Sequence, residues 1–202
     1  MKRIIALSFA AMTLLAFAAC ASKGTDDNKQ VESDYKSSLE VLDAIWEKYS
    51  DDDKFPVLGG NRDAMVENKP GAFDLNAAAD LTSMLLLPTE NIAALKSAAS
   101  MVHMINGNTF TAAVFETNVV PETFSQILVN AANAKQFVCG RPEMMVTLKI
   151  DNYVIMAFGT DGLTETFKDY ALKVEGVTLI HSGPIVFNGG NTGGFSGVQI
   201  PI

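Results

Sequence analysis

Three side chains of the sequence could together perform nucleophilic catalysis: one cysteine and two histidines. Cys139 stands between Val138 and Gly140-Arg141-Pro142, and the histidines are His103 and His181. A thiol activated by a nearby cation such as Arg141, with an imidazole as base, would make a cysteine-dependent hydrolase or thiol enzyme. The spacing of these residues carries no catalytic signature, and a free cysteine commonly behaves as a small buried apolar residue. We therefore expect Cys139 to be buried and the protein to be non-catalytic, with the thiol enzyme as the alternative.

Metal-ligating residue types are present, but they do not stand at ligand spacing. Soft ligands that suit Cu(I) occur at Met101, Met104, Met144, Met145, Met156, His103 and Cys139. Methionines within apolar runs more often fill a core, and two distant histidines without a cysteine pair do not make a zinc site. Asp51-Asp52-Asp53 lacks the alternation and the glycine of a calcium loop. We expect no metal and no cofactor.

Two further groups of residues could act on anions or on sugars. Gly159-Thr160-Asp161-Gly162 joins a predicted strand to a predicted helix, where backbone amides can hold an anion. Asp161 would repel phosphate, however, and capping of the helix explains the segment. A carboxylate pair for glycoside hydrolysis could lie among the 23 acidic residues, but it is defined by a distance that one sequence does not reveal.

The composition argues against nucleic acid as a partner. The chain has 202 residues, with 15 Lys and Arg against 23 Asp and Glu and a formal net charge of -8. No cluster of cations is dense enough to neutralise phosphates. With 48% hydrophobic residues the chain is long enough for one buried core and short for two domains.

The first twenty residues have the organisation of an export signal. Met1-Lys2-Arg3 is basic, and the apolar run that follows, 4–17, is shorter than the roughly 20 residues of a membrane-spanning helix. Phe17-Ala18-Ala19-Cys20 then resembles the lipobox of bacterial lipoproteins, although that family favours Leu where this chain has Phe17. In the family, diacylglycerol alkylates this cysteine before cleavage, and the new amino terminus is usually acylated afterwards.

The resemblance implies that residues 1–19 are a lipoprotein signal peptide and that Cys20 is lipidated. The exported chain would then be held by acyl chains, palmitate among them, on the bacterial cell membrane or the outer membrane, with its domain facing the periplasm or the exterior. Ala21 after the cysteine favours passage outward, by resemblance to the sorting signals of Gram-negative cells. An ordinary secretory signal cut near Ala19 is the alternative.

The mature chain divides into a spacer, one domain and a tail. Residues 21–32 are small and polar, so we expect a flexible linker between the lipid and the domain. Residues 33–187 carry the apolar periodicity of a single folded domain. Residues 188–202 begin with the glycine-rich sequence NGGNTGGFSG and are expected to form a mobile tail.

Hydrophobic periodicity places the elements in the first part of the domain. Apolar residues at spacings of three and four predict a helix from Ser33, as N-cap, to about residue 49, and a second helix over about 75–87. The prolines and glycines between them predict a long loop. Residues 89–104 predict a helical turn followed by a strand, which Asn106-Gly107-Asn108 turns back into the next strand.

The remaining elements indicate the fold class. They are a strand over 109–116, a helix from Pro121, strands over 144–150 and 153–158, a helix from Asp161, and a last strand over 177–187 interrupted by Gly183-Pro184. This β-α-β-β-α-β order is that of ferredoxin-like folds, in which two helices cover one face of an antiparallel sheet. We therefore predict an α+β fold with a ferredoxin-like split sheet and extra N-terminal helices.

Several stretches in the last two-thirds of the chain belong together: Met101-Val102-His103-Met104, 110–115, Cys139-Gly140-Arg141-Pro142, Asp151-Asn152-Tyr153-Val154 and Ala157-Phe158-Gly159. On these stretches the chain resembles, over about residues 90 to 175, a group of uncharacterised lipoprotein-type domains from anaerobic gut bacteria. None of these stretches is a catalytic signature, and the group implies no site residues. The expected function is a membrane-anchored lipoprotein whose domain binds an envelope protein or a small ligand.

Overall fold

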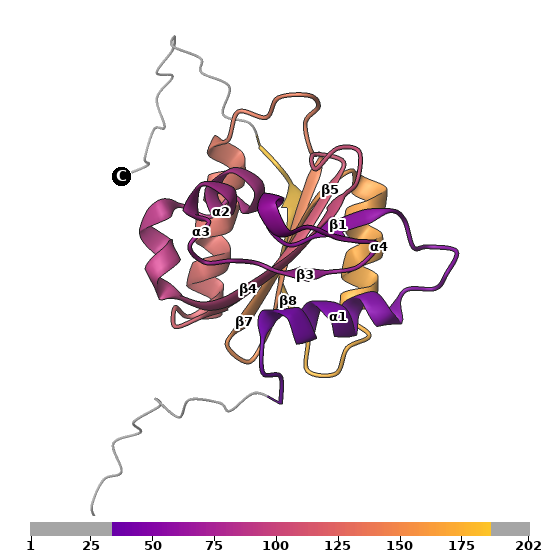
Figure 1. The fold of residues 1–202 in the computed structure, drawn as a ribbon, viewed down its shortest axis with the longest axis horizontal. Helices are drawn as coiled ribbons and strands as arrows, with labels where there is room; N and C mark the ends of the chain where they lie inside the picture. Colours follow the sequence, from indigo (N-terminus) through magenta and orange to yellow (C-terminus); the bar gives the residue numbers. More distant parts are fainter. Residues whose placement is uncertain (1–33, 187–202) are drawn as a thin grey trace, which may run out of the picture. The chain divides into compact units, whose positions relative to one another are not determined.

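An eight-stranded antiparallel sheet forms the centre of residues 34–186, the part of the chain that the computed structural model describes (Figure 1). The strand order is β2-β1-β4-β5-β7-β6-β8, and β3 pairs with β4 outside this path. The predicted signal peptide, Cys20, the spacer 21–32 and the tail 188–202 lie outside the described residues. Within residues 34–186, no helix has the length and the apolar character needed to cross a membrane.

The elements have the following bounds. The strands are β1 (Val57–Gly59), β2 (Val66–Glu67), β3 (Gly71–Ala72), β4 (Leu95–His103), β5 (Phe110–Thr117), β6 (Met144–Ile150), β7 (Tyr153–Gly159) and β8 (Thr178–Pro184). The helices are α1 (Ser38–Lys48), α2 (Ala78–Leu85), α3 (Pro121–Ala134) and α4 (Asp161–Ala171), with 3-10 turns η1 (Arg62–Ala64) and η2 (Thr89–Ala94).

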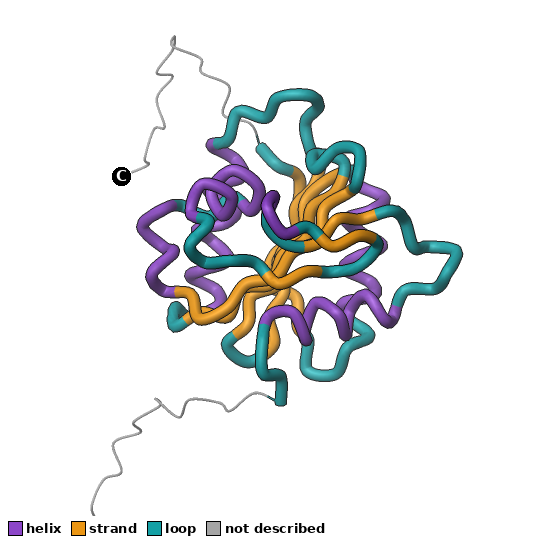
Figure 2. The backbone as a smooth tube through the Cα atoms, viewed as in Figure 1, coloured by secondary structure: helices purple, strands orange, loops and turns teal. Residues whose placement is uncertain are grey.

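Helices cover both faces of the sheet, as the purple segments on either side of the orange strands show in Figure 2. One core lies between the sheet and helices α1 and α4, and the other lies between the sheet and helices α2 and α3. Strand β5 alternates between them: Phe110 and Val114 face α1 and α4, whereas Phe115 faces α2 and α3. Because both faces are covered, β7 is buried along its whole length.

The mixed α/β class and the antiparallel sheet are as expected, but the ferredoxin-like arrangement is not confirmed. That arrangement would place the last strand beside β5, whereas β8 pairs with β6. The reason lies in the hairpin of β4 and β5, which fills the free edge of β5. As a result, β6 lies two strands from β5, and β8 lies two strands from β7 in the same direction across the sheet. Since β5 and β7 are antiparallel, crossovers of one handedness put α3 and α4 on opposite faces.

The first helix begins later than its apolar periodicity suggests. The predicted N-cap, Ser33, is wrong, because the side chain of Ser37 accepts the hydrogen bond from the backbone N–H of Glu40. The side chain of Glu40 in turn accepts from the backbone N–H of Lys36, one residue before the N-cap that a capping box would use. The next residue, Ser38, is fully buried and hydrogen-bonds to Ser97 on β4 at 2.8 Å, which ties the start of α1 to the sheet.

The stretch expected to be a loop before α2 contains three short strands. Gly59 of β1 and Gly71 of β3 lie so close that a Cβ on Gly59 would stand 2.2 Å from the backbone nitrogen of Gly71. β1 pairs with residues 101–103 of β4 and β3 with residues 99–100, so the two glycines allow two backbones to meet end to end along one edge of β4. Strands of two or three residues have no periodicity that a sequence could reveal.

The hairpins and the later helices are confirmed. Strands β4 and β5 pair across the Asn106-Gly107-Asn108 turn, and β6 and β7 pair across Asp151-Asn152, where Asp151 has a φ of 51°. Pro121 opens α3 and Asp161 opens α4, as expected. The last strand is an edge strand, and Gly183 and Pro184 pair with β6 at its end instead of interrupting it, so residues 185–186 lie beyond the strand; its register shifts between Leu179 and His181.

Candidate functional site

Two loops at one end of the sheet are held together by asparagine side chains. We call them the loop pair: residues 104–109 between β4 and β5, and residues 135–143 between α3 and β6. The Nδ2 of Asn106 donates to the carbonyl of Cys139 at 2.9 Å. The Nδ2 of Asn108 donates to the carbonyls of Val138 at 2.6 Å and of Gly140 at 2.9 Å. These bonds satisfy carbonyls that have no strand partner, so the second loop takes its shape from the first.

The prediction that Cys139 is buried is wrong. Its side chain is exposed, and its backbone has a φ of 64°, in the left-handed region that residues other than glycine rarely adopt. The asparagines hold the backbone of this loop, and the side chains beside it project outward: Val138 is 77% exposed, and Ile105 on the partner loop is 88% exposed. The conformation of this loop is therefore set by hydrogen bonds from the asparagines to its backbone, and not by packing of the Cys139 thiol.

The structure does not join the thiol to either histidine. His103 ends β4 on the face of α1 and α4, where its ring stacks on Phe55 and its Nδ1 accepts a hydrogen bond from the N–H of Ile105. His181 on β8 lies opposite Thr147, whose hydroxyl reaches Ser125 of α3, so it belongs to the other face. Within residues 34–186, Cys139 has no side-chain hydrogen bond to a histidine. The thiol enzyme stays a prediction.

The candidate copper ligands are separated by the sheet. Met101 and Met144 pack on the face of α1 and α4, whereas Met145 and Met156 pack on the face of α2 and α3. Met104 is 40% exposed in the loop pair. Among the described residues, no three His, Cys, Asp or Glu side chains come close enough to hold a metal ion. Met101, Met144, Met145 and Met156 therefore pack as core residues, as their apolar context suggests, whereas Met104 does not.

The acidic run 51–53 and the Gly159–Gly162 junction both have structural partners. Asp53 accepts hydrogen bonds from Tyr170 at 2.6 Å and from Ser50 at 2.8 Å, and these bonds lower the pKa of its carboxyl. At the start of α4, the backbone N–H of Asp161 donates to the carboxylate of Glu143 at 2.8 Å. A carboxylate of the protein thus already occupies the position where an anion would bind at this helix end.

A pocket of ≈ 220 Å³ lies beside the loop pair, on the face of the sheet that carries α2 and α3. Its apolar wall is formed by Met84, Val102 and Phe158. Its polar rim is formed by Ser83, Asn108, Thr111 and Lys135, together with Gly107. An apolar wall with a few polar groups at the rim is typical of a small-molecule site.

Most donors of this rim are already engaged by the protein. The amide of Asn108 binds the second loop, and the hydroxyl of Thr111 donates to the carbonyl of Gly107 at 2.8 Å. The Nζ of Lys135 donates to the backbone carbonyl of Ser83 and lies 5.5 Å from the centre of the Phe137 ring. An ammonium carries three N–H donors. Lys135 therefore retains donors that a bound molecule could use.

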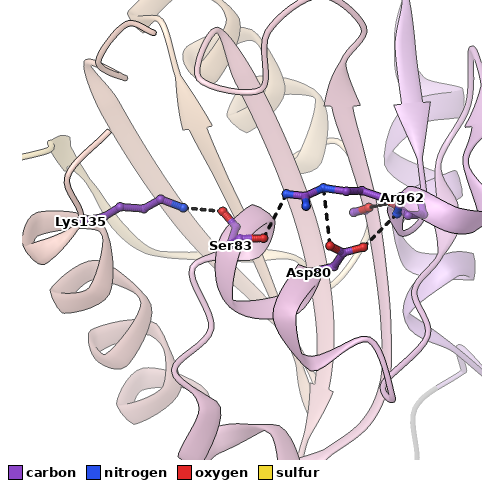
Figure 3. A network of polar contacts seen from close by, with 6 residues as sticks. Arg62, Asp80, Ser83 and Lys135 are labelled. Carbon is purple, nitrogen blue, oxygen red and sulfur yellow. Dashed lines mark hydrogen bonds and ion pairs between the residues drawn. The ribbon is translucent and has the colours of Figure 1, made fainter. Parts of the chain in front are cut away.

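Figure 3 shows the charges around this lysine. Ser83 lies between Lys135 and Arg62, and its hydroxyl accepts a hydrogen bond from Arg62 at 3.2 Å. Asp80 pairs with Arg62, with 3.5 Å between Oδ1 and Nε, and also accepts from its backbone N–H at 3.0 Å. Burial and the charge of Arg62 lower the pKa of Lys135. The carboxylate of Asp80 is thus engaged by Arg62, whereas Lys135 faces the pocket.

Sequence reasoning did not find this pocket. Its residues come from α2, from β4, β5 and β7, and from both loops of the pair, and no spacing along the chain unites them. The one local signal is Lys135, which directly follows α3, but a cation at a helix C-terminus is also favourable without any ligand. Comparisons of the chain with protein-family models, curated proteins and solved structures found no match. The geometry of the pocket is therefore the main evidence for a site.

Proposed function

We propose that the chain is an exported, lipid-anchored lipoprotein of the bacterial envelope, and that its folded domain binds a small ligand without catalysing a reaction. The anchor is proposed from the lipobox-like Phe17-Ala18-Ala19-Cys20. The observation that supports ligand binding is the pocket. Lys135 stands at the edge of its apolar wall and has N–H donors beyond the one that bonds to Ser83. Gly107, Asn108 and Lys135 of its rim belong to the loop pair, which the asparagines hold in one shape, so this part of the site is preorganised.

The anchor predicts that an acyl group is attached to one cysteine and not to the other. When the full chain is expressed in a bacterium fed an alkyne analogue of palmitate, the wild type and Cys139→Ala are expected to carry the label. Cys20→Ala is expected to carry none, because it lacks the thiol that is alkylated. In-gel fluorescence measures the label, and the mass of the N-terminal peptide locates it. Label on Cys20→Ala, or a mature chain that starts elsewhere than Cys20, would leave an ordinary secretory signal as the better account.

The binding site predicts that filling the pocket abolishes binding of small molecules. Three compounds with the same five-carbon chain serve as probes: pentanoate, pentanamide and pentylamine. At least one of them is expected to shift the amide resonances of Gly107, Asn108 and Thr111 saturably in NMR spectra of the full chain in lipid nanodiscs. Met84→Phe places a rigid ring in the pocket and should weaken this binding about tenfold or more.

The matched control is Met65→Phe, the same substitution at a residue that is 38% exposed and does not line the pocket. It is expected to bind the probes as the wild type does. If all three probes leave these resonances unchanged, or if Met84→Phe and Met65→Phe bind them equally, the pocket is not the binding site and the proposal fails.

A thiol enzyme is the second candidate, because Cys139 is exposed, as a nucleophile must be. It has weaker support than the binding domain. In the part of the chain that the structure describes, the Cys139 thiol donates no hydrogen bond to an imidazole base, and its carbonyl rather than its thiol is the group held by Asn106.

A further inference from the structure

The charge balance at the pocket indicates which class of ligand it takes. The chain is acidic, yet the charged group that reaches the pocket is an ammonium. Among the ion pairs formed by residues 34–186, none includes Lys135. Asp80, the acid in the network around Lys135, pairs with the guanidinium of Arg62 and accepts a hydrogen bond from the backbone N–H of Arg62. The described residues thus place a cation at the pocket without a carboxylate to neutralise it.

The surroundings of Lys135 make an anion favourable beside it. Its side chain is half-buried next to apolar groups, and a second cation, Arg62, lies on the other side of Ser83. Loss of water and repulsion by a like charge both disfavour a charged ammonium. A carboxylate placed against Nζ would offset both effects, because it supplies the opposite charge and accepts the N–H groups that Ser83 leaves unused.

The other groups of the rim fit a carboxylate better than a phosphate. A phosphate needs several donors, but the amide of Asn108 and the hydroxyl of Thr111 are committed to backbone carbonyls. What remains is the ammonium of Lys135 and the O–H of Ser83, whose oxygen accepts from Arg62, opposite three apolar side chains. That combination matches a molecule with a single small anionic head and an apolar body.

The volume favours a small ligand. The pocket measures ≈ 220 Å³, below the roughly 300–1,000 Å³ of sites for drug-sized molecules. Pentanoate, a carboxylate on a short apolar chain, is a ligand of this class.

We propose that the pocket binds a short aliphatic carboxylate, with its carboxylate on the Nζ of Lys135 and its chain against Met84, Val102 and Phe158. This inference rests on the proposed binding function and specifies its ligand. Arg62 does not touch the ligand in this arrangement. It engages the carboxylate of Asp80 through its side chain and its backbone N–H.

The test compares pentanoate with its neutral isostere pentanamide, using NMR titrations of the full chain in lipid nanodiscs. The wild type is expected to bind pentanoate about tenfold more tightly than pentanamide, because only the carboxylate forms a charge-assisted hydrogen bond. Lys135→Met keeps a chain of similar length without the charge, and should reduce this preference to about one. Lys96→Met, at an exposed lysine outside the pocket, should leave the preference unchanged.

The outcomes separate this inference from the proposed function. If pentanamide binds the wild type as tightly as pentanoate does, or if the preference persists in Lys135→Met, the carboxylate assignment is overturned while the pocket remains a binding site. If neither probe binds, both proposals fall. Should Lys135→Met not fold, the comparison of the two probes on the wild type still decides the question.

A third probe identifies the source of the carboxylate. N-acetylleucine presents a carboxylate and a branched apolar group as the C-terminal residue of a peptide does. Tighter binding of N-acetylleucine than of pentanoate would assign the site to peptide ends, and the reverse would assign it to free short-chain acids. Either result supports a carboxylate on Lys135.

Discussion

Replacing Gly159 with alanine is expected to lower the free energy of unfolding by at least about 3 kcal/mol. A Cβ at this position would stand 2.2 Å from the carbonyl oxygen of Thr109 and 2.8 Å from the Cα of Phe110. Both are backbone atoms where the 104–109 loop enters β5, so no side chain can rotate away. The two strands would have to separate where Phe110 pairs with Gly159, and the hydrogen bond from the Thr160 N–H to Thr109 would be lost with them.

Gly162 provides the matched control, because it lies three residues away and a Cβ there would meet no atom within 4 Å. It stands in the first turn of α4, where alanine is favoured over glycine by about 0.5–1 kcal/mol. Gly162→Ala is therefore expected to be neutral or stabilising. Urea unfolding of the full chain measures both variants, with midpoint and slope recorded separately. Equal destabilisation by the two substitutions would contradict the close approach of β5 and β7 at Gly159.

These two glycines illustrate what a single sequence can predict. In the sequence they belong to one strand-to-helix junction, and capping of a helix explains both of them. The structure gives Gly159 a second role that depends on β5, about fifty residues earlier in the chain. Local patterns predict which conformation a residue adopts, but the space around it is determined by segments that are distant in sequence.

The same distinction explains which elements were predicted correctly. The hairpins and α3 and α4 have a periodicity or a turn within their own residues, and they lie where the sequence indicates. Which strand pairs with β8, by contrast, depends on segments that are far from β8 in the sequence. It follows from the β4–β5 hairpin, which occupies one edge of β5 and leaves the edge of β6 for β8. The predicted hairpin thus already conflicted with the ferredoxin-like strand order.

The candidate site was less predictable than the fold. Cys139 was expected to be buried because free cysteines commonly are, but its conformation depends on Asn106 and Asn108 in another loop. The Asn-Gly-Asn sequence predicts the turn and does not reveal that the amides reach across to bind a second loop. Likewise, Lys135 gains its position at the pocket from Ser83 on α2, a residue that no motif singles out.

Replacing Phe110 with alanine is the second substitution with a large expected effect, a loss of about 3–5 kcal/mol in the free energy of unfolding. The ring of Phe110 is fully buried at the start of β5. It packs edge-on against Phe55 with 5.1 Å between ring centres, and lies 5.7 Å from the ring of Phe167 on α4. Its removal would leave a cavity bounded by strands on one side and by a helix on the other. These elements are fixed by other contacts, so the cavity cannot collapse fully.

Ile105→Ala is the control, because it also shortens an apolar side chain near this end of the sheet, yet Ile105 is 88% exposed. Its expected effect is within about 0.5 kcal/mol. Because Phe110 faces α1 and α4 and the pocket lies on the opposite face, Phe110→Ala should lower stability while the folded fraction still binds the pocket probes. Urea unfolding measures the first effect and NMR titration the second. A loss of probe binding in the folded fraction would mean that the two faces of the sheet are coupled, because β5 also carries Thr111 at the pocket rim.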